Sequence, residues 1–113
     1  MKLVFISGQD NQEFWDLLDK LRNEAKIIKS EWKGDFYVTE YDLNGTKYIY
    51  EEDMDLGIPY SIIKVDKYKR SQINKWKQEY ADTVNGIILS EYDVKKNDGW
   101  FEDCEIEEDE EAI

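Results

Sequence analysis

The stretch FYVTEYDLNGTKYIYEE, residues 36–52, carries the strongest fold signal in the chain. Two runs rich in aromatic and β-branched side chains flank the dipeptide Asn44-Gly45. Asn-Gly is typical of the two-residue type I′ turn, because both central residues of that turn need a positive φ. The sequence therefore predicts a β-hairpin in which Leu43 pairs with Thr46.

This register sorts the side chains of the hairpin between the two faces of its strands. One face carries four tyrosines: Tyr37, Tyr41, Tyr48 and Tyr50. The other face places Asp42 opposite Lys47, and we expect these two side chains to form an ion pair. Aromatic platforms on sheets can stack RNA bases, but such platforms normally have basic surroundings, which this acidic chain lacks. We therefore expect the tyrosine face to line or rim the core.

The segment before the hairpin predicts a strand and a helix. Residues 2–7 form a short apolar run with β character. Apolar residues at helical spacing then predict an amphipathic helix over about residues 11–28. Asp10 and Glu13 have the spacing of a capping box at the start of this helix.

The segment after the hairpin predicts a further β run, a second helix and a last strand. Residues 58–65 are the β-like run, and apolar positions from Ile73 to Val84 predict the helix, with Ser71 or Asp66 as its cap. Asn85-Gly86 is a typical helix stop, and the last strand is predicted at residues 87–94.

The predicted elements form a single α+β domain over residues 1–96, followed by an acidic C-terminal segment at residues 97–113. Their order is β-α-β-β-(β)-α-β. With the third β run set aside, this order matches the ferredoxin-like plan, an antiparallel sheet with two helices on one face. That plan hosts many unrelated functions, so it carries no functional argument.

Charge is concentrated at the C-terminal end. The chain has 113 residues and a net charge of −12. The last sixteen residues, DGWFEDCEIEEDEEAI, contain nine acidic side chains and no basic one, so residues 1–97 hold 18 acidic and 15 basic side chains. Phosphates repel such a chain, which disfavours direct nucleic-acid binding. The acidic end instead favours a basic protein partner, including one that itself binds nucleic acid.

Several functional classes are disfavoured by what the sequence lacks. There is no histidine, the commonest general base and metal ligand. The single cysteine, Cys104, has acidic neighbours that should disfavour its thiolate. Residues 51–55 fail as an EF-hand loop, since Leu56 and Ile62 stand where Gly and Glu are required. We expect no metal, no cofactor and no catalysis. The apolar run at residues 3–6 is too short for a signal peptide or a membrane span, so we expect a cytoplasmic protein.

The candidate partner-binding residues lie in two acidic segments. The first contains Trp100, Phe101, Glu102, Asp103, Glu105, Glu107, Glu108, Asp109, Glu110 and Glu111. The second contains Glu51, Glu52, Asp53 and Asp55. The two aromatic residues of the first segment have two interpretations: they pack back on the domain, or they anchor a partner.

The C-terminal segment is either a solvated, disordered tail or an anionic ligand for a basic groove. Duplex DNA carries one charge per ~1.7 Å of its axis. The segment would carry about one charge per 6 Å if extended and about one per 2.7 Å if helical. A tail that imitates a nucleic acid should therefore form a helix or fold against the body.

The leading hypothesis is a non-catalytic protein that inhibits a basic, nucleic-acid-processing protein by nucleic-acid mimicry. In size and charge the chain is similar to small phage-encoded anti-defence proteins and DNA mimics, a likeness of composition alone. Three alternatives stay open: an immunity protein that neutralises a nuclease toxin, a small carboxylate-based enzyme or ligand-binding domain, and a structural component. The leading hypothesis involves neither direct nucleic-acid binding nor a membrane.

Overall fold

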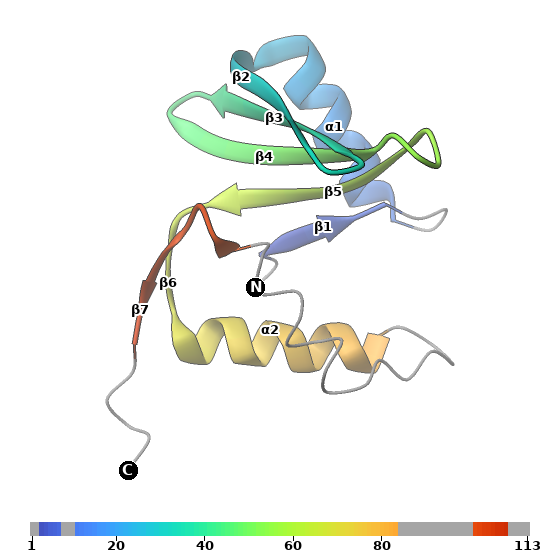
Figure 1. Ribbon diagram of the computed structural model, residues 1–113. Coiled ribbons are helices and arrows are strands. Elements are labelled where there is room, and N and C mark those ends of the chain that lie inside the picture. The colour runs from blue at the N-terminus through green and yellow to red at the C-terminus, as the bar shows by residue number, and fades with distance from the viewer. Residues whose placement is uncertain (1–2, 8–10, 84–100, 109–113) are drawn as a thin grey trace. The chain divides into compact units, whose positions relative to one another are not determined.

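The computed structural model has a mixed α+β fold, drawn in Figure 1, and describes residues 3–7, 11–83 and 101–108. The strand predicted at residues 87–94 and the domain boundary predicted between residues 96 and 97 lie outside this part of the chain. Within it, no helix combines the length and apolar character that crossing a membrane requires.

The chain divides into two compact units, which are described separately. The first unit is Val4–Val65, and the second is Met1–Leu3 together with Asp66–Ile113.

The first unit is a five-stranded antiparallel sheet with one helix. Its elements are β1 (Val4–Ile6), α1 (Gln12–Glu24), β2 (Lys26–Lys33), β3 (Phe36–Leu43), β4 (Thr46–Asp53) and β5 (Ile58–Val65). The strand order is β1-β5-β4-β3-β2, so β2 to β5 form a meander and β1 pairs with β5 (Figure 1). The ferredoxin-like arrangement is not confirmed. The third β run, which that plan sets aside, is β5, and it lies inside the sheet between β1 and β4.

The β3–β4 hairpin is confirmed in its predicted register. Leu43 pairs with Thr46, and each strand continues the pairing to its far end. Asn44 has a φ of 53° and Gly45 a φ of 90°, the positive values that a type I′ turn needs.

The ion pair predicted across this hairpin is wrong in its partners. Asp42 and Lys47 are opposite each other, but the Asp42 carboxylate accepts the N–H of Gly45 at 2.8 Å and so closes the turn. The Lys47 ammonium instead lies 4.0 Å from the carboxylate of Glu40. Short polar side chains often bond to nearby turn backbone in this way, and this competes with pairing across strands.

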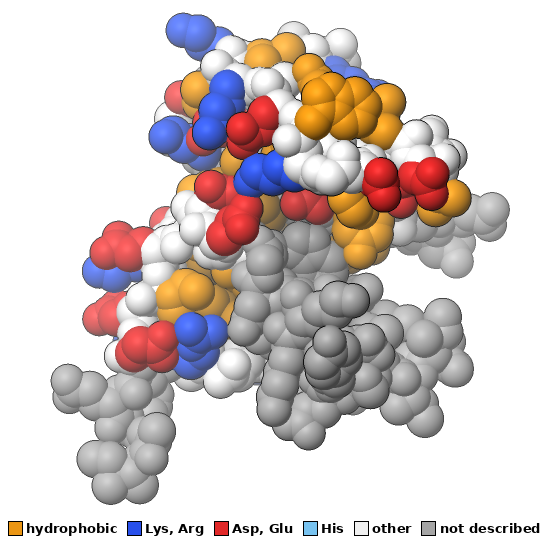
Figure 2. Space-filling model, in the orientation of Figure 1, with side chains coloured by type: hydrophobic (Ala, Val, Ile, Leu, Met, Phe, Trp, Pro, Cys, Tyr) orange, Lys and Arg blue, Asp and Glu red, His pale blue; other side chains and the backbone are white. Residues whose placement is uncertain are grey.

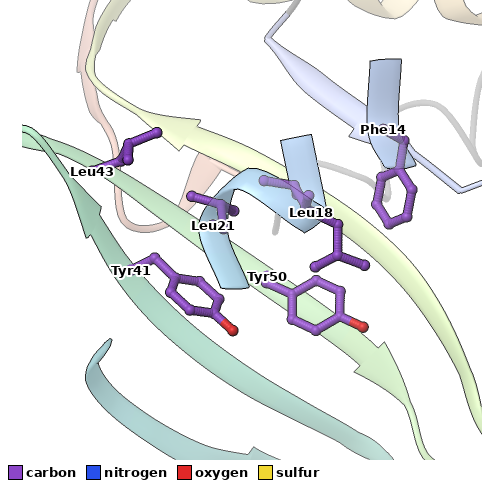
Figure 3. Packing of buried hydrophobic residues seen from close by; sticks show 7 residues of the cluster. Phe14, Leu18, Leu21, Tyr41, Leu43 and Tyr50 are labelled. Atoms are coloured by element: carbon purple, nitrogen blue, oxygen red, sulfur yellow. The ribbon is translucent and has the colours of Figure 1, made fainter. Parts of the chain in front are cut away.

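The core of the first unit lies between α1 and the tyrosine face of the sheet (Figure 3). Its buried members are Phe14, Leu18, Leu21, Tyr41, Leu43, Tyr50 and Ile62. The three helical residues recur at intervals of four and three, which places them on one side of α1. Tyr48 packs against the same cluster, so the prediction that the tyrosines line or rim the core is confirmed for Tyr41, Tyr48 and Tyr50. The ring of Tyr37 is half-buried and contacts that of Trp32.

Helix α1 is shorter than predicted at its C-terminal end. It ends at Glu24, and Ala25 has an extended backbone with a φ of −85° and a ψ of 155°. The prediction had continued the helix to residue 28, but Ile27 already pairs with Tyr41 in the sheet. The prediction had included Ile28 in the apolar spacing of the helix. β-Branched isoleucines favour strands, however, and pairing with β3 prevails over that spacing.

The start of α1 also differs from the predicted capping box. Asn11 is the N-cap residue, and its side chain makes no capping hydrogen bond. Its amide instead donates to the carbonyl of Ile6, which ties the helix start to β1. The predicted cap residue, Asp10, lies outside the described residues.

The second unit contains β6 (Lys67–Lys69), α2 (Arg70–Thr83) and β7 (Glu105–Glu107). Strands β6 and β7 pair in parallel. At the start of α2, the side-chain oxygen of Gln72 accepts the backbone N–H of Lys69 at 2.8 Å, one half of a capping box. The predicted caps were wrong: Ser71 lies inside the helix, and the Asp66 carboxylate accepts the N–H of Lys67.

Replacing Leu18 by Ala should destabilise the first unit by about 3 kcal/mol, because it opens a cavity between α1 and the sheet. Lys20→Ala, an exposed change two residues away on the same helix, is the control and should cost less than about 0.5 kcal/mol. Urea unfolding of the two variants measures both effects. Equal free energies of unfolding would contradict the assigned core.

Candidate partner-binding surface

The C-terminal acidic segment begins with a buried aromatic residue. Phe101 is only 1% exposed. Its ring makes edge-on contacts with Trp76 at 5.5 Å and with Tyr68 at 6.3 Å between ring centroids. Of the two interpretations of this aromatic pair, packing on the body holds for Phe101. Trp100 lies outside the described residues.

Strand β7 places two predicted site residues beside a basic strand. Glu105 is the register partner of Lys67, and Glu107 that of Lys69. The Lys67 ammonium lies 3.9 Å from the carboxylate of Glu105. Every basic residue of β6 therefore faces an acidic residue of β7, and the segment at residues 101–108 is folded against its own unit.

Glu108 continues this pattern just after β7. Both of its carboxylate oxygens accept hydrogen bonds from the guanidinium of Arg70, at 3.0 and 3.3 Å. This two-point geometry is the strong form of a carboxylate–arginine contact. The segment is therefore paired with cations of its own chain at positions that sequence reasoning did not identify.

The acidic side chains of this segment nevertheless remain open to solvent. Glu102, Asp103 and Glu107 are exposed. The side chains of Glu105 and Glu108 are 74% and 69% exposed despite their ion pairs. Figure 2 shows acidic and basic side chains side by side at the surface of the second unit. The surface is thus an alternating pattern of charge with an acidic excess.

Cys104 lies half-buried within this acidic surface. Burial raises the pKa of its thiol, and the carboxylates of Asp103 and Asp66 raise it further. The direction agrees with the prediction from its acidic neighbours, although burial is the larger cause. A thiol whose pKa is raised is a poor nucleophile near neutral pH.

The second acidic segment lies at the end of β4 and in the following turn. The Asp53 carboxylate accepts the N–H groups of Asp55 at 3.0 Å and Leu56 at 3.1 Å, so it closes the β4–β5 turn. The Glu51 carboxylate accepts the hydroxyl of Ser61 at 3.4 Å. These carboxylates have partners within the fold, and their position is explained by the structure of the first unit.

Glu52 belongs to a polar cluster at the rim of the core. Its carboxylate accepts the hydroxyl of Tyr50 at 3.3 Å. The Arg22 guanidinium donates to the same hydroxyl at 3.5 Å and lies 5.7 Å from the centre of the Tyr50 ring. Sequence reasoning missed Arg22. It follows Leu18 by four residues, and this spacing places it on the core-facing side of α1.

This cluster perturbs the phenols that it contains. Burial, followed by the nearby Glu52 carboxylate, raises the pKa of Tyr50 from 10.0 to about 12. Burial also raises the pKa of Tyr41. Both phenols therefore stay neutral well above physiological pH.

Within residues 3–7, 11–83 and 101–108, no three cysteine, aspartate or glutamate side chains are grouped to hold a metal ion. Comparison of the chain with protein-family models, with curated proteins and with solved structures found no significant match. The argument for function therefore depends on the residues themselves. What the described carboxylates offer is electrostatic attraction for a cationic partner.

The free energy of unfolding should fall as the pH rises from 10 to about 12. In this range the unfolded chain releases the Tyr50 proton, whose pKa is 10.0 there, while the folded chain retains it. Tyr50→Phe should reduce this dependence, and Tyr37→Phe, at the half-buried ring beside Trp32, is the control. Urea unfolding across this pH range measures the slope. The same slope in wild type and Tyr50→Phe would contradict the assignment.

Phe101→Ala should destabilise the second unit by about 3–5 kcal/mol, because it removes a fully buried ring. Phe101→Leu, which keeps more of the volume, should cost less. Glu107→Ala, at an exposed position on the same segment, should stay within about 0.5 kcal/mol of wild type. Thermal unfolding followed by near-ultraviolet circular dichroism compares the three. A neutral effect of Phe101→Ala would restore the interpretation of this residue as a partner anchor.

Proposed function

We propose that the protein is a non-catalytic inhibitor that binds a basic, nucleic-acid-processing protein through its acidic C-terminal segment. The carboxylates stand where the phosphates of a nucleic acid would otherwise bind. A phage anti-defence protein is the biological setting that fits a small acidic chain of this kind. The observation that carries the proposal is that residues 101–108 are ordered while their carboxylates are exposed.

Order matters to this proposal because a mimic must present charge at fixed positions. Phe101 is buried, and β7 pairs with β6, so the carboxylates that follow are attached to a folded unit. Glu105 and Glu107 project from the same side of β7, about 7 Å apart. Binding to such a surface costs less conformational entropy than binding to a free tail, because fewer side chains and backbone torsions have to become ordered.

The internal ion pairs leave this surface available. Exposed ion pairs contribute only about 0–1 kcal/mol to stability. A basic groove can therefore share or replace the contacts of Lys67 and Arg70 with Glu105 and Glu108 at little cost. Three further acidic residues continue the segment in sequence: Asp109, Glu110 and Glu111.

The second acidic segment has a smaller part in the proposal. Glu51, Glu52 and Asp53 are half-buried and hydrogen-bonded within the first unit. Asp55 is the exposed member. We therefore centre the partner-binding surface on the C-terminal segment and not on the β4–β5 turn.

The test compares two variants with the same net charge. Glu105→Gln with Glu107→Gln removes two carboxylates from β7, whereas Asp19→Asn with Glu24→Gln removes two from exposed positions on α1. Wild type and both variants are immobilised and incubated with a cell lysate that contains basic nucleic-acid-binding proteins, and the retained proteins are identified by mass spectrometry. The β7 variant should lose the proteins that wild type retains, and the α1 variant should keep them.

Elution with DNA distinguishes nucleic-acid mimicry from binding of the acidic segment at some other basic surface of the partner. Duplex DNA added at constant salt should displace the retained proteins, because it competes for the same basic groove. Raising the salt should also weaken retention, since exposed charges are screened over about 10 Å at 0.1 M. Equal retention by both variants, or a complex that DNA does not displace, would refute the proposal. Deleting residues 98–113 is a poorer test, because it also removes the buried Phe101.

A further inference from the structure

Strand β2 is an exposed edge of the sheet. It pairs with β3 on one side, and the strand order of the described residues places it last (Figure 1). All eight of its residues are exposed. They include three large apolar side chains: Ile27 at 58%, Ile28 at 43% and Trp32 at 62% exposure. An edge of this kind presents backbone N–H and C=O groups that can pair with another strand.

The charge of β2 is opposite to that of the chain. Its sequence KIIKSEWK has three lysines and one glutamate, within a chain of net charge −12. The edge therefore does not suit the basic partner proposed above. Lysines on an edge usually oppose pairing. Here, however, Glu31 lies between two of them, with its carboxylate 3.9 Å from the ammonium groups of both Lys29 and Lys33.

This alternation suits a second copy of the same strand. In an antiparallel pair related by a twofold axis, opposite residues share a face of the sheet. With the axis at Ser30, Lys29 lies opposite Glu31 of the second copy, and the pair occurs twice. Opposite charges in directly opposed positions stabilise a strand pair, and like charges destabilise it.

The neighbouring registers are disfavoured by the same charges. Moving the axis to residue 29 sets Lys29 against its own copy, and moving it to residue 31 sets Glu31 against its own copy. The register at Ser30 also brings Trp32 across from Ile28, an exposed apolar residue that lies at the irregularity of β2. The irregularity in the β2–β3 pairing lies between Ile27 and Lys29, outside the central residues 29–31.

We propose that two copies of the protein associate through antiparallel pairing of β2 with β2, with the twofold axis at Ser30. The two five-stranded sheets then become one continuous sheet. Strand β2 shares no residue with the acidic segment, so the inference is independent of the proposed inhibitory function.

Charge reversal tests the pairing and its register together. Lys29→Glu and Glu31→Lys each place like charges opposite one another twice, and each should weaken the dimer roughly tenfold. The double variant restores opposite charges and should return to the affinity of wild type. Sedimentation equilibrium from about 1 µM to about 1 mM measures the dissociation constants.

The two single variants also exclude a simpler cause of association. If the acidic segment of one copy bound the lysines of β2 in another, Glu31→Lys would strengthen association and Lys29→Glu would weaken it. Strand pairing predicts that both weaken it. Opposite effects of the two variants, or a wild-type protein that stays monomeric throughout, would overturn the proposal.

A disulfide measures the register directly. Opposed Cα atoms lie about 4.5–5.5 Å apart in an antiparallel pair, within the span of a disulfide. Ser30→Cys, made together with Cys104→Ser, should therefore form a cross-linked dimer on mild oxidation. Lys29→Cys in the same background is the control, because residue 29 and its copy are offset by about 8 Å and exceed that span. Cross-linking of the control in preference to Ser30→Cys would refute the register.

Discussion

The backbone conformation of the Asn44-Gly45 turn is the constraint on which the first unit depends. Positive φ at both residues joins β3 to β4 without a bulge and so fixes which side chains share a face. A slip of one residue between β3 and β4 would place Tyr41 and Tyr50 on opposite faces, so only one of them could face α1, because successive strand residues alternate between faces. The core packing of α1 and the polar cluster at Arg22 both require this register, so a local turn determines contacts far along the chain.

Sequence reasoning succeeded where the signal is local. The hairpin, its tyrosine face, the β5 run and the second helix all follow from neighbouring residues. Strand β2 was missed because apolar and polar residues do not alternate along its sequence. Every side chain is exposed, and only pairing with β3 makes the segment a strand. The sheet order was missed for a related reason: the position of β1 beside β5 depends on residues more than fifty positions apart.

For the acidic site, too, sequence reasoning succeeded with local features and failed with contacts between distant residues. Composition alone identified the C-terminal segment, because nine acidic residues among sixteen are visible without a fold. It could not show which carboxylates the fold itself uses. Arg70 and Glu108 are 38 residues apart, and the parallel pairing of β6 with β7 is what brings them together. Composition also could not show that Asp53 closes the β4–β5 turn, since a turn-closing carboxylate and a partner-binding carboxylate look alike in sequence.

The acidic segment is held mainly by packing and only weakly by charge. Burying the ring of Phe101 contributes about 1.5–3 kcal/mol. The exposed ion pairs of Glu105 and Glu108 contribute at most about 1 kcal/mol each. Screening by salt weakens the ion pairs and does not weaken the packing of Phe101. The segment can therefore remain folded at a salt concentration that releases a basic partner, which means that loss of binding in high salt would report on the carboxylates and not on unfolding of their support.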